Sequence, residues 1–220
     1  MEPTGAAENL QVIRTLMERS ALYRRAMAPV MLAAGLFGVA GWGLGKALSI
    51  DSLLAFVGFW FAIAALTVAV ALLIVRRQAI GSAEPFWTPP TRRIIRAMVP
   101  SLAAGGLMTS SMLLVLPGAA LEAAPICIMI WILFYGLAIH SAGMIISRGV
   151  RLLGWMFILP APPLVIAIFA PGGIGFNGTA LTWLTPNIQM GLTFGLFHLI
   201  AAAYLFLTER RGQATQSSAV

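Results

Sequence analysis

Six long apolar segments, separated by polar or charged stretches, dominate the pattern of this chain. They cover residues 27–48, 52–75, 97–116, 124–146, 152–171 and 187–208. A helix needs about 20 apolar residues to cross a hydrocarbon core about 30 Å thick, and each segment provides roughly that length. The pattern therefore predicts an all-α, polytopic membrane protein, with six transmembrane helices forming one membrane domain over residues 27–208.

The polar segment before the first span, residues 1–26, has a helical pattern of its own. Leu10, Ile13 and Met17 recur at steps of three and four, whereas Arg14 and Glu18 turn away from them. This spacing predicts an amphipathic helix on the cytoplasmic headgroups, and the same face is an alternative docking site for a cytoplasmic protein partner. Residues 209–220 are expected to form a disordered cytoplasmic tail.

Composition supports the membrane class and excludes others. Hydrophobic residues make up 60% of the 220 residues, charged residues only 10%, and the mean hydropathy is +0.91. Every arginine falls on one side of the predicted bilayer, while the only lysine, Lys46, lies near the other. The positive-inside rule then places both termini in the cytoplasm. The net charge of +7 reflects this topology and contact with anionic lipid, not a nucleic-acid surface, because no soluble basic domain is present.

Arginines on the cytoplasmic side form the predicted contact surface. The candidates for binding lipid headgroups or a cytoplasmic partner are Arg14, Arg19, Arg92, Arg93 and Arg96. Thr91 is expected to cap a short interfacial helix that leads into the third span.

The two histidines, His140 in the fourth span and His198 in the sixth, are the main candidate chemical groups. Each lies in a stripe of small residues spaced by four, three and four positions: Gly136, His140, Gly143 and Ser147, and then Gly191, Gly195, His198 and Ala202. Such stripes let helices approach closely and let a polar side chain bond across the interface. The two histidines are therefore predicted to face one bundle interior.

Three interpretations of these histidines remain open. The first is an interhelical hydrogen bond, with Tyr135 and Tyr204 among the available partners. The second is ligation of a b-type haem by both imidazoles, although their axial offset of roughly 6 Å would require tilted helices. The third is a polar cavity for a proton path or a small molecule.

Span five contains a proline cluster at mid-depth: Pro160, Pro162 and Pro163. Proline deletes backbone donors, so this helix should be kinked or broken, and interrupted helices are one pointer to a transporter site. No Asp or Glu falls within the middle of a span, and no motif for intramembrane proteolysis or metal binding is found. Cys127 is the only cysteine, so no intrachain disulfide forms.

Four segments of the sequence are similar to segments of a known protein family. They are IRTLMERS (13–20), FWTPPTRRIIRAMVP (86–100), YGLAIHSAG with RGVRLLGW (135–155), and FGLFHLIAAAYLF (194–206). Over nearly its whole length the chain resembles an uncharacterised family of small bacterial integral membrane proteins with six predicted spans. The resemblance implies a bacterial inner-membrane location and, from frequent proximity to genes for winged-helix regulators, a regulatory setting. His198 matches the recurring family histidine, whereas His140 and the proline cluster depart from the pattern.

These observations lead to one expected function and two alternatives. We expect a non-enzymatic accessory, sensor or regulatory membrane protein that needs no cofactor. The alternatives are a small-molecule or ion transporter that uses the kinked fifth span, and a b-haem redox module. The glycines from Gly38 to Gly45 are expected to pack either within the chain or against a second copy.

Overall fold

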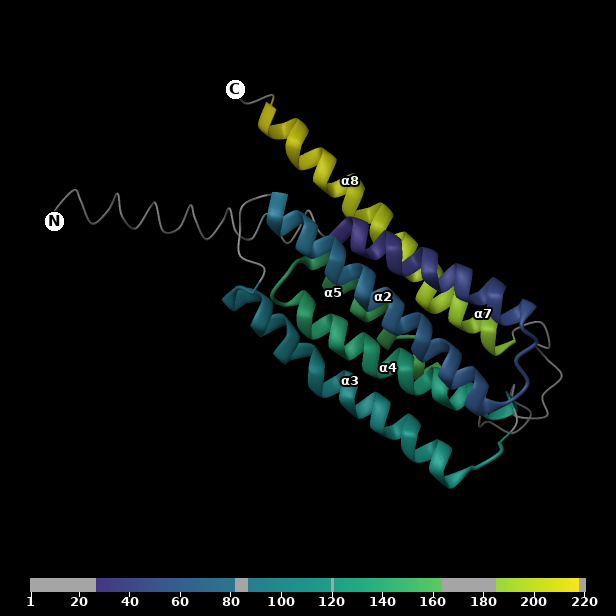
Figure 1. Cartoon of the computed structure of the whole chain (residues 1–220). Helices are drawn as coiled ribbons and strands as arrows, with labels where there is room; N and C mark the ends of the chain where they lie inside the picture. Colours follow the sequence, from purple (N-terminus) through teal and green to yellow (C-terminus); the bar gives the residue numbers. More distant parts are fainter. Residues whose placement is uncertain (1–26, 82–86, 120, 164–184, 218–220) are drawn as a thin grey trace.

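The computed structural model describes residues 27–81, 87–119, 121–163 and 185–217, and shows a bundle of long helices (Figure 1). In chain order the helices are the first helix (Met27–Ala47), α2 (Leu53–Gly81), α3 (Pro89–Val115), the short 3₁₀ turn η1 (Leu121–Ala123), α4 (Ala124–Gly143), α5 (Arg148–Ile158), α7 (Pro186–Met190), the π-helix η2 (Gly191–Leu196) and α8 (Phe197–Ser217). The last three are continuous, and we call them together the last helix.

The all-α prediction is confirmed for these residues. Five helices are long and apolar enough to cross a membrane: Met27–Ala47, Leu53–Gly81, Pro89–Val115, Ala124–Gly143 and Pro186–Thr208. Large apolar side chains are exposed along them, which is typical of surfaces that face lipid and indicates a membrane protein. Among the described residues, the predicted fifth span has no such helix. Its described part is α5, which has 11 residues, and 164–171 lies outside the described residues.

The start of α3 differs from the prediction. The interfacial helix expected after Thr91 and the span expected from residue 97 form one helix that begins at Pro89, so Arg92, Arg93 and Arg96 lie on its first turns. Its cap is Thr88 and not Thr91: the Thr88 hydroxyl accepts a hydrogen bond from the Thr91 backbone N–H. Prolines at the first two helical positions suit this start, because they lack N–H groups that would be unpaired there.

The last helix is longer than predicted, because its backbone remains helical to Ser217. The helical backbone over 209–217 differs from the disordered tail expected from residue 209. Glu209, Arg210 and Arg211 are favourable helix formers, so propensity can extend the helix beyond the apolar span. The predicted amphipathic arm over residues 1–26 lies outside the described residues.

Helix α4 forms the centre of the bundle, between α3 and α5 (Figure 1). It contributes ten buried residues, more than any other described helix. Helix α2, by contrast, buries residues only near its ends: Leu53, Phe56, Val57, Trp60 and Ala79. The middle of α2 is therefore packed loosely against the bundle.

Two glycine seams hold pairs of antiparallel helices at short distance. In the first, a Cβ atom on Gly38 would lie 2.5 Å from the Gly195 backbone nitrogen, so the first helix and the last helix touch through their backbones. In the second, a Cβ atom on Gly154 of α5 would lie 2.6 Å from the His140 backbone nitrogen of α4. Small residues permit such close contacts, which increase the van der Waals attraction between helices in lipid.

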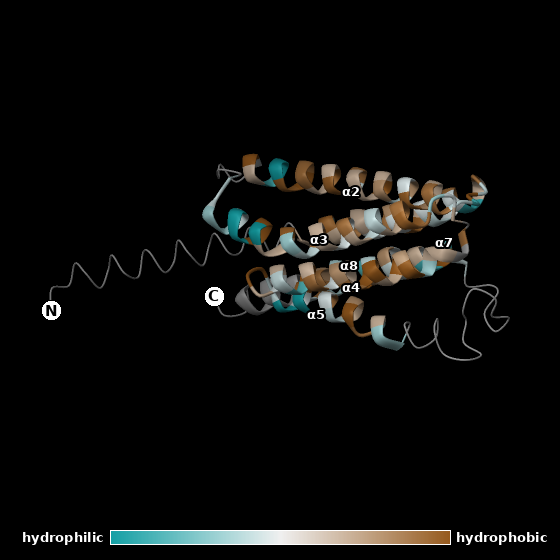
Figure 2. Ribbon diagram, turned by 90° about the horizontal axis from the view of Figure 1, so that it is seen from below, coloured by the Kyte–Doolittle hydropathy of each residue, from teal (hydrophilic) through white to brown (hydrophobic). Residues whose placement is uncertain are grey.

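The arginines lie at one end of the bundle. Arg76 and Arg77 are near the end of α2, Arg92 near the start of α3, and Arg148 at the start of α5. Figure 2 shows hydrophilic turns on the left of the view, where α2 ends and α3 begins. Lys46, near the end of the first helix, lies at the opposite end.

Candidate functional site

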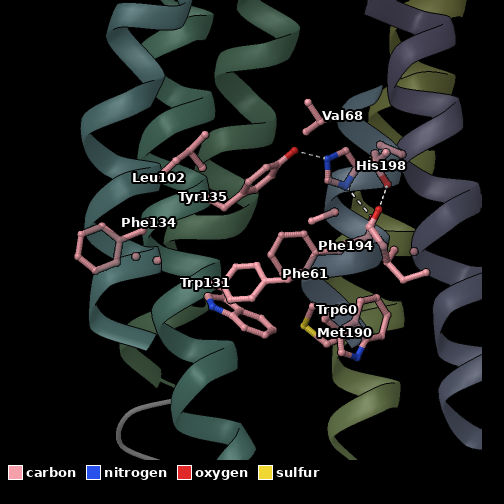
Figure 3. A pocket seen from close by; sticks show the side chains of 17 residues that line it. Trp60, Phe61, Val68, Leu102, Trp131, Phe134, Tyr135, Met190, Phe194 and His198 are labelled. Carbon is pink, nitrogen blue, oxygen red and sulfur yellow. Dashed lines mark hydrogen bonds between the residues drawn. The ribbon is translucent and has the colours of Figure 1, made fainter. Parts of the chain in front are cut away.

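A cavity of about 220 Å³ lies between α2, α3, α4, the first helix and the last helix (Figure 3). Its wall is almost entirely apolar and aromatic, with contributions from Trp60, Phe61, Trp131, Phe134 and Phe194. Its polar side chains are the pair formed by Tyr135 of α4 and His198 of α8, together with the Thr67 hydroxyl of α2. An apolar enclosure with a few placed polar groups is the usual form of a small-molecule site.

The mouth of the cavity lies at the side of the bundle. The lining residues Phe61 and Val68 of α2, and Leu102 of α3, are exposed large apolar side chains. All three are near the middle of their helices, so the opening between α2 and α3 faces the region that lipid would occupy. The loose packing of mid-α2 against the bundle accounts for this opening.

Tyr135 and His198 form a fully paired relay. The Tyr135 Oη atom lies 2.7 Å from His198 Nε2, and His198 Nδ1 lies 2.8 Å from the Phe194 carbonyl oxygen. A carbonyl can only accept, so Nδ1 carries the proton and donates to it. The neutral imidazole then accepts at Nε2, and the Tyr135 hydroxyl donates. No carboxylate is among the residues that line this cavity, so a neutral ring is the form that fits.

Aromatic packing fixes the orientation of both rings. The Tyr135 ring centroid lies 5.0 Å from that of Phe157 and 5.1 Å from that of Phe194, both in edge-on contact. His198 is 2% exposed and also contacts Phe157 edge-on. These rings hold the polar pair at one place on the cavity wall.

The π-helix η2 precedes His198 and changes which way it points. Its hydrogen bonds run from residue i to i+5, as in the bond from the Phe197 N–H to the Leu192 carbonyl. The wider turn holds an extra residue, so the side chains after η2 are rotated about the helix axis relative to the side chains before it. Gly191 and Gly195 consequently contact the first helix, at Trp42 and Val39, whereas His198 reaches across to α4.

The prediction that both histidines face one interior is therefore wrong. Tyr135 and His140 are five residues apart on α4, which turns them about 140° from each other around the helix. The His140 ring packs edge-on against Trp155 of α5, with centroids 5.2 Å apart. Its Nδ1 atom is buried and has no hydrogen-bond partner. The arrangement required for haem ligation by both histidines is absent, and both nitrogens of His198 are already bonded within the protein.

The other predicted site residues are dispersed. Tyr204 is 42% exposed and lies against Gly149 of α5, away from the His198 pair. Helix α5 ends at Ile158, and Leu159 with Pro160 forms a turn before helical backbone resumes over 161–163, the segment that holds Pro162 and Pro163. Ser147, predicted to extend the His140 stripe, instead caps α5 by accepting from the Val150 N–H.

The arginine candidates divide into two groups. Arg92, Arg93 and Arg96 are exposed on the first turns of α3, and the Arg92 guanidinium lies 6.0 Å from the ring centroid of Trp87. Arginine above a tryptophan near the end of an apolar helix suits the headgroup level of a bilayer. Arg14 and Arg19 lie outside the described residues.

Sequence reasoning missed two tryptophan anchors of the cavity wall. Trp131 Nε1 donates to the Thr109 hydroxyl at 2.8 Å, and Trp60 Nε1 donates to Asn187 Oδ1 at 3.1 Å. Thr109 and Asn187 are buried. A buried tryptophan within a span must find an acceptor for its indole N–H, and that requirement was the available signal.

The site belongs to a helical membrane-type bundle with a cavity that opens laterally. A comparison with known protein families, with curated proteins and with solved structures finds no match. The family resemblance of the sequence therefore stays a prediction.

Proposed function

We propose that this chain is a non-enzymatic sensor or accessory protein of a bacterial inner membrane, controlled by a small apolar molecule that enters from the bilayer. The observation that carries this proposal is the lateral cavity of about 220 Å³ with one buried polar pair in its wall. An apolar cavity of about 150 Å³ is sufficient to bind benzene, so this one has room for a substituted ring.

The position of the polar pair supports a sensing role over catalysis. The hydrogen bond between Tyr135 and His198 connects α4 to the last helix. Within the last helix, η2 lies directly before His198 and carries the glycines that pack against the first helix. A ligand beside this pair therefore touches the contact between three helices. Among the described lining residues, no acidic side chain joins the Tyr135–His198 pair as the third member of a hydrolytic triad.

The signal would leave the membrane at the arginine end. Exposed arginines gather there on α2, α3 and α5, where they suit anionic headgroups and a cytoplasmic protein partner. In this proposal both termini are cytoplasmic, as the positive-inside rule expects.

A cysteine-labelling experiment tests that orientation. Cys127 is fully buried, so a Cys127→Ala background removes it without opening a reactive site. We expect Leu48→Cys to react with a membrane-impermeant maleimide in intact cells, and Met144→Cys to react only after permeabilisation. Both positions are highly exposed and lie at opposite ends of the bundle. The reverse pattern of labelling would contradict the orientation.

Gly106 offers a direct test of the cavity. It lines the cavity, and a Cβ atom there meets nothing within 4 Å, so Gly106→Leu adds bulk at the cavity wall without disturbing the helix contacts. Gly58→Leu is the matched control, because Gly58 is equally open but lies outside the cavity. Bromobenzene should quench the fluorescence of Trp60 and Trp131 saturably in the wild type and in Gly58→Leu, but not in Gly106→Leu. Equal quenching in all three proteins would refute the cavity as a ligand site.

Transport is the second candidate function, supported by the break in α5 at Leu159 and Pro160. Interrupted helices often border a transported substrate. A transporter would move the probe or an ion across sealed proteoliposomes, whereas a sensor would bind the probe and leave the flux at the level of empty vesicles. Flux that falls when Gly106→Leu fills the cavity would favour the transporter.

A further inference from the structure

The hydrogen-bond donors around the cavity are all engaged within the protein. The lining side chains that can donate are Trp60, Thr67, Trp131, Tyr135 and His198, and each has an acceptor at 3.1 Å or less. The lining residues lie beyond the first turns of their helices, where backbone N–H groups are bonded within the helix. A ligand in this cavity therefore meets no free donor among the described lining residues.

Acceptor capacity, by contrast, remains. A tyrosine hydroxyl that donates its single proton to His198 still has lone pairs on the oxygen. The Thr67 hydroxyl, which donates to the Ile63 carbonyl at 2.8 Å, retains the same capacity. Of these two oxygens, Tyr135 Oη is the more polarised, because it donates into an imidazole that itself donates onward to Phe194. Hydrogen bonds in such a chain strengthen one another.

We infer that the cavity selects an apolar molecule that carries a hydroxyl group, and that this hydroxyl donates a hydrogen bond to Tyr135 Oη. The volume of about 220 Å³ limits the enclosed part of the ligand to about the size of a substituted ring. A ligand of similar shape that can only accept hydrogen bonds would place its oxygen against Tyr135 Oη, whose proton is already donated to His198, and would form no hydrogen bond. This inference rests on the proposed ligand-binding function and specifies its substrate class.

A phenol and the ether in which a methyl group replaces its hydroxyl proton test the inference. 4-Bromophenol can donate, whereas 4-bromoanisole cannot, and the bromine of each quenches Trp60 and Trp131, which line the cavity. Quenching that persists in Gly106→Leu gives the nonspecific background from partitioning into detergent, and it is subtracted. We expect the phenol to bind the wild-type protein about tenfold more tightly than the ether, as one net hydrogen bond provides.

Two variants identify the accepting atom. In the double variant Tyr135→Phe with His198→Leu the relay is gone, and the preference for the phenol should disappear. In Thr67→Val it should remain about tenfold. If the preference instead survives in the double variant and disappears in Thr67→Val, the assignment to Tyr135 is wrong.

The outcomes separate this inference from the function on which it rests. Equal affinity of the two probes in the wild type, with both lost in Gly106→Leu, would overturn the hydroxyl selection and leave the ligand site standing. Failure of bromobenzene and of both substituted probes to bind the wild type would overturn the ligand site and the inference together.

Discussion

Replacing Gly38 with valine is expected to lower the free energy of unfolding by about 3 kcal/mol or more, because the new side chain has no room against a backbone. A Cβ atom on Gly38 would lie 2.5 Å from the Gly195 nitrogen and 2.6 Å from its Cα atom. Neither atom belongs to a side chain that can rotate away. The first helix and the last helix would have to separate, and their remaining contacts would be lost with them.

Gly43→Val is the matched control in the same helix. A Cβ atom at Gly43 meets nothing within 4 Å, so the same change in size and helix propensity should alter the unfolding free energy only slightly. Denaturant titrations of the purified proteins in mixed micelles, followed by far-ultraviolet circular dichroism, would measure both. Equal losses in the two variants would show that helix propensity, and not the Gly38 contact, controls stability.

The helices could be predicted from the sequence because the length of an apolar segment depends only on consecutive residues and not on tertiary contacts. The first, fourth and last spans begin and end near their predicted residues, whereas the second begins as predicted but continues to Gly81. The helix expected after Thr91 was predicted as a short interfacial segment because three arginines lower the local hydropathy there, but it is the first part of α3, which begins at Pro89. Hydropathy identifies where lipid can surround a helix, and capping by Thr88 and the prolines determines where the helix begins.

The sequence did not predict which neighbouring helix each small-residue stripe packs against. Both stripes share the same spacing, yet the one with His140 packs on α5, and the one with Gly191 and Gly195 packs on the first helix. A spacing rule assumes a regular α-helix, whereas η2 widens the turn just before His198. The pairing of His198 with Tyr135 was among the predicted alternatives, and it is the one found. The cavity itself depends on the loose packing of mid-α2, which no local pattern encodes.

Tyr135→Phe and His198→Leu are each expected to cost about 2 kcal/mol of unfolding free energy, and the double variant clearly less than the sum. Each single change leaves one member of the pair, the His198 Nε2 lone pair or the Tyr135 hydroxyl proton, without its partner in an apolar wall. Removing both members leaves neither group unpaired. The bond from His198 to Phe194 is lost in both variants that lack the histidine, so it cancels in the cycle.

Tyr204→Phe is the control for this cycle, since Tyr204 is part-exposed and lies outside the cavity lining. It should leave stability unchanged within about 0.5 kcal/mol. The same titrations in mixed micelles give all the values needed. Strictly additive costs of Tyr135→Phe and His198→Leu would mean that the two side chains contribute independently. In that case the 2.7 Å bond would not couple α4 to the last helix, and a ligand at Tyr135 would have no route to the glycine seam.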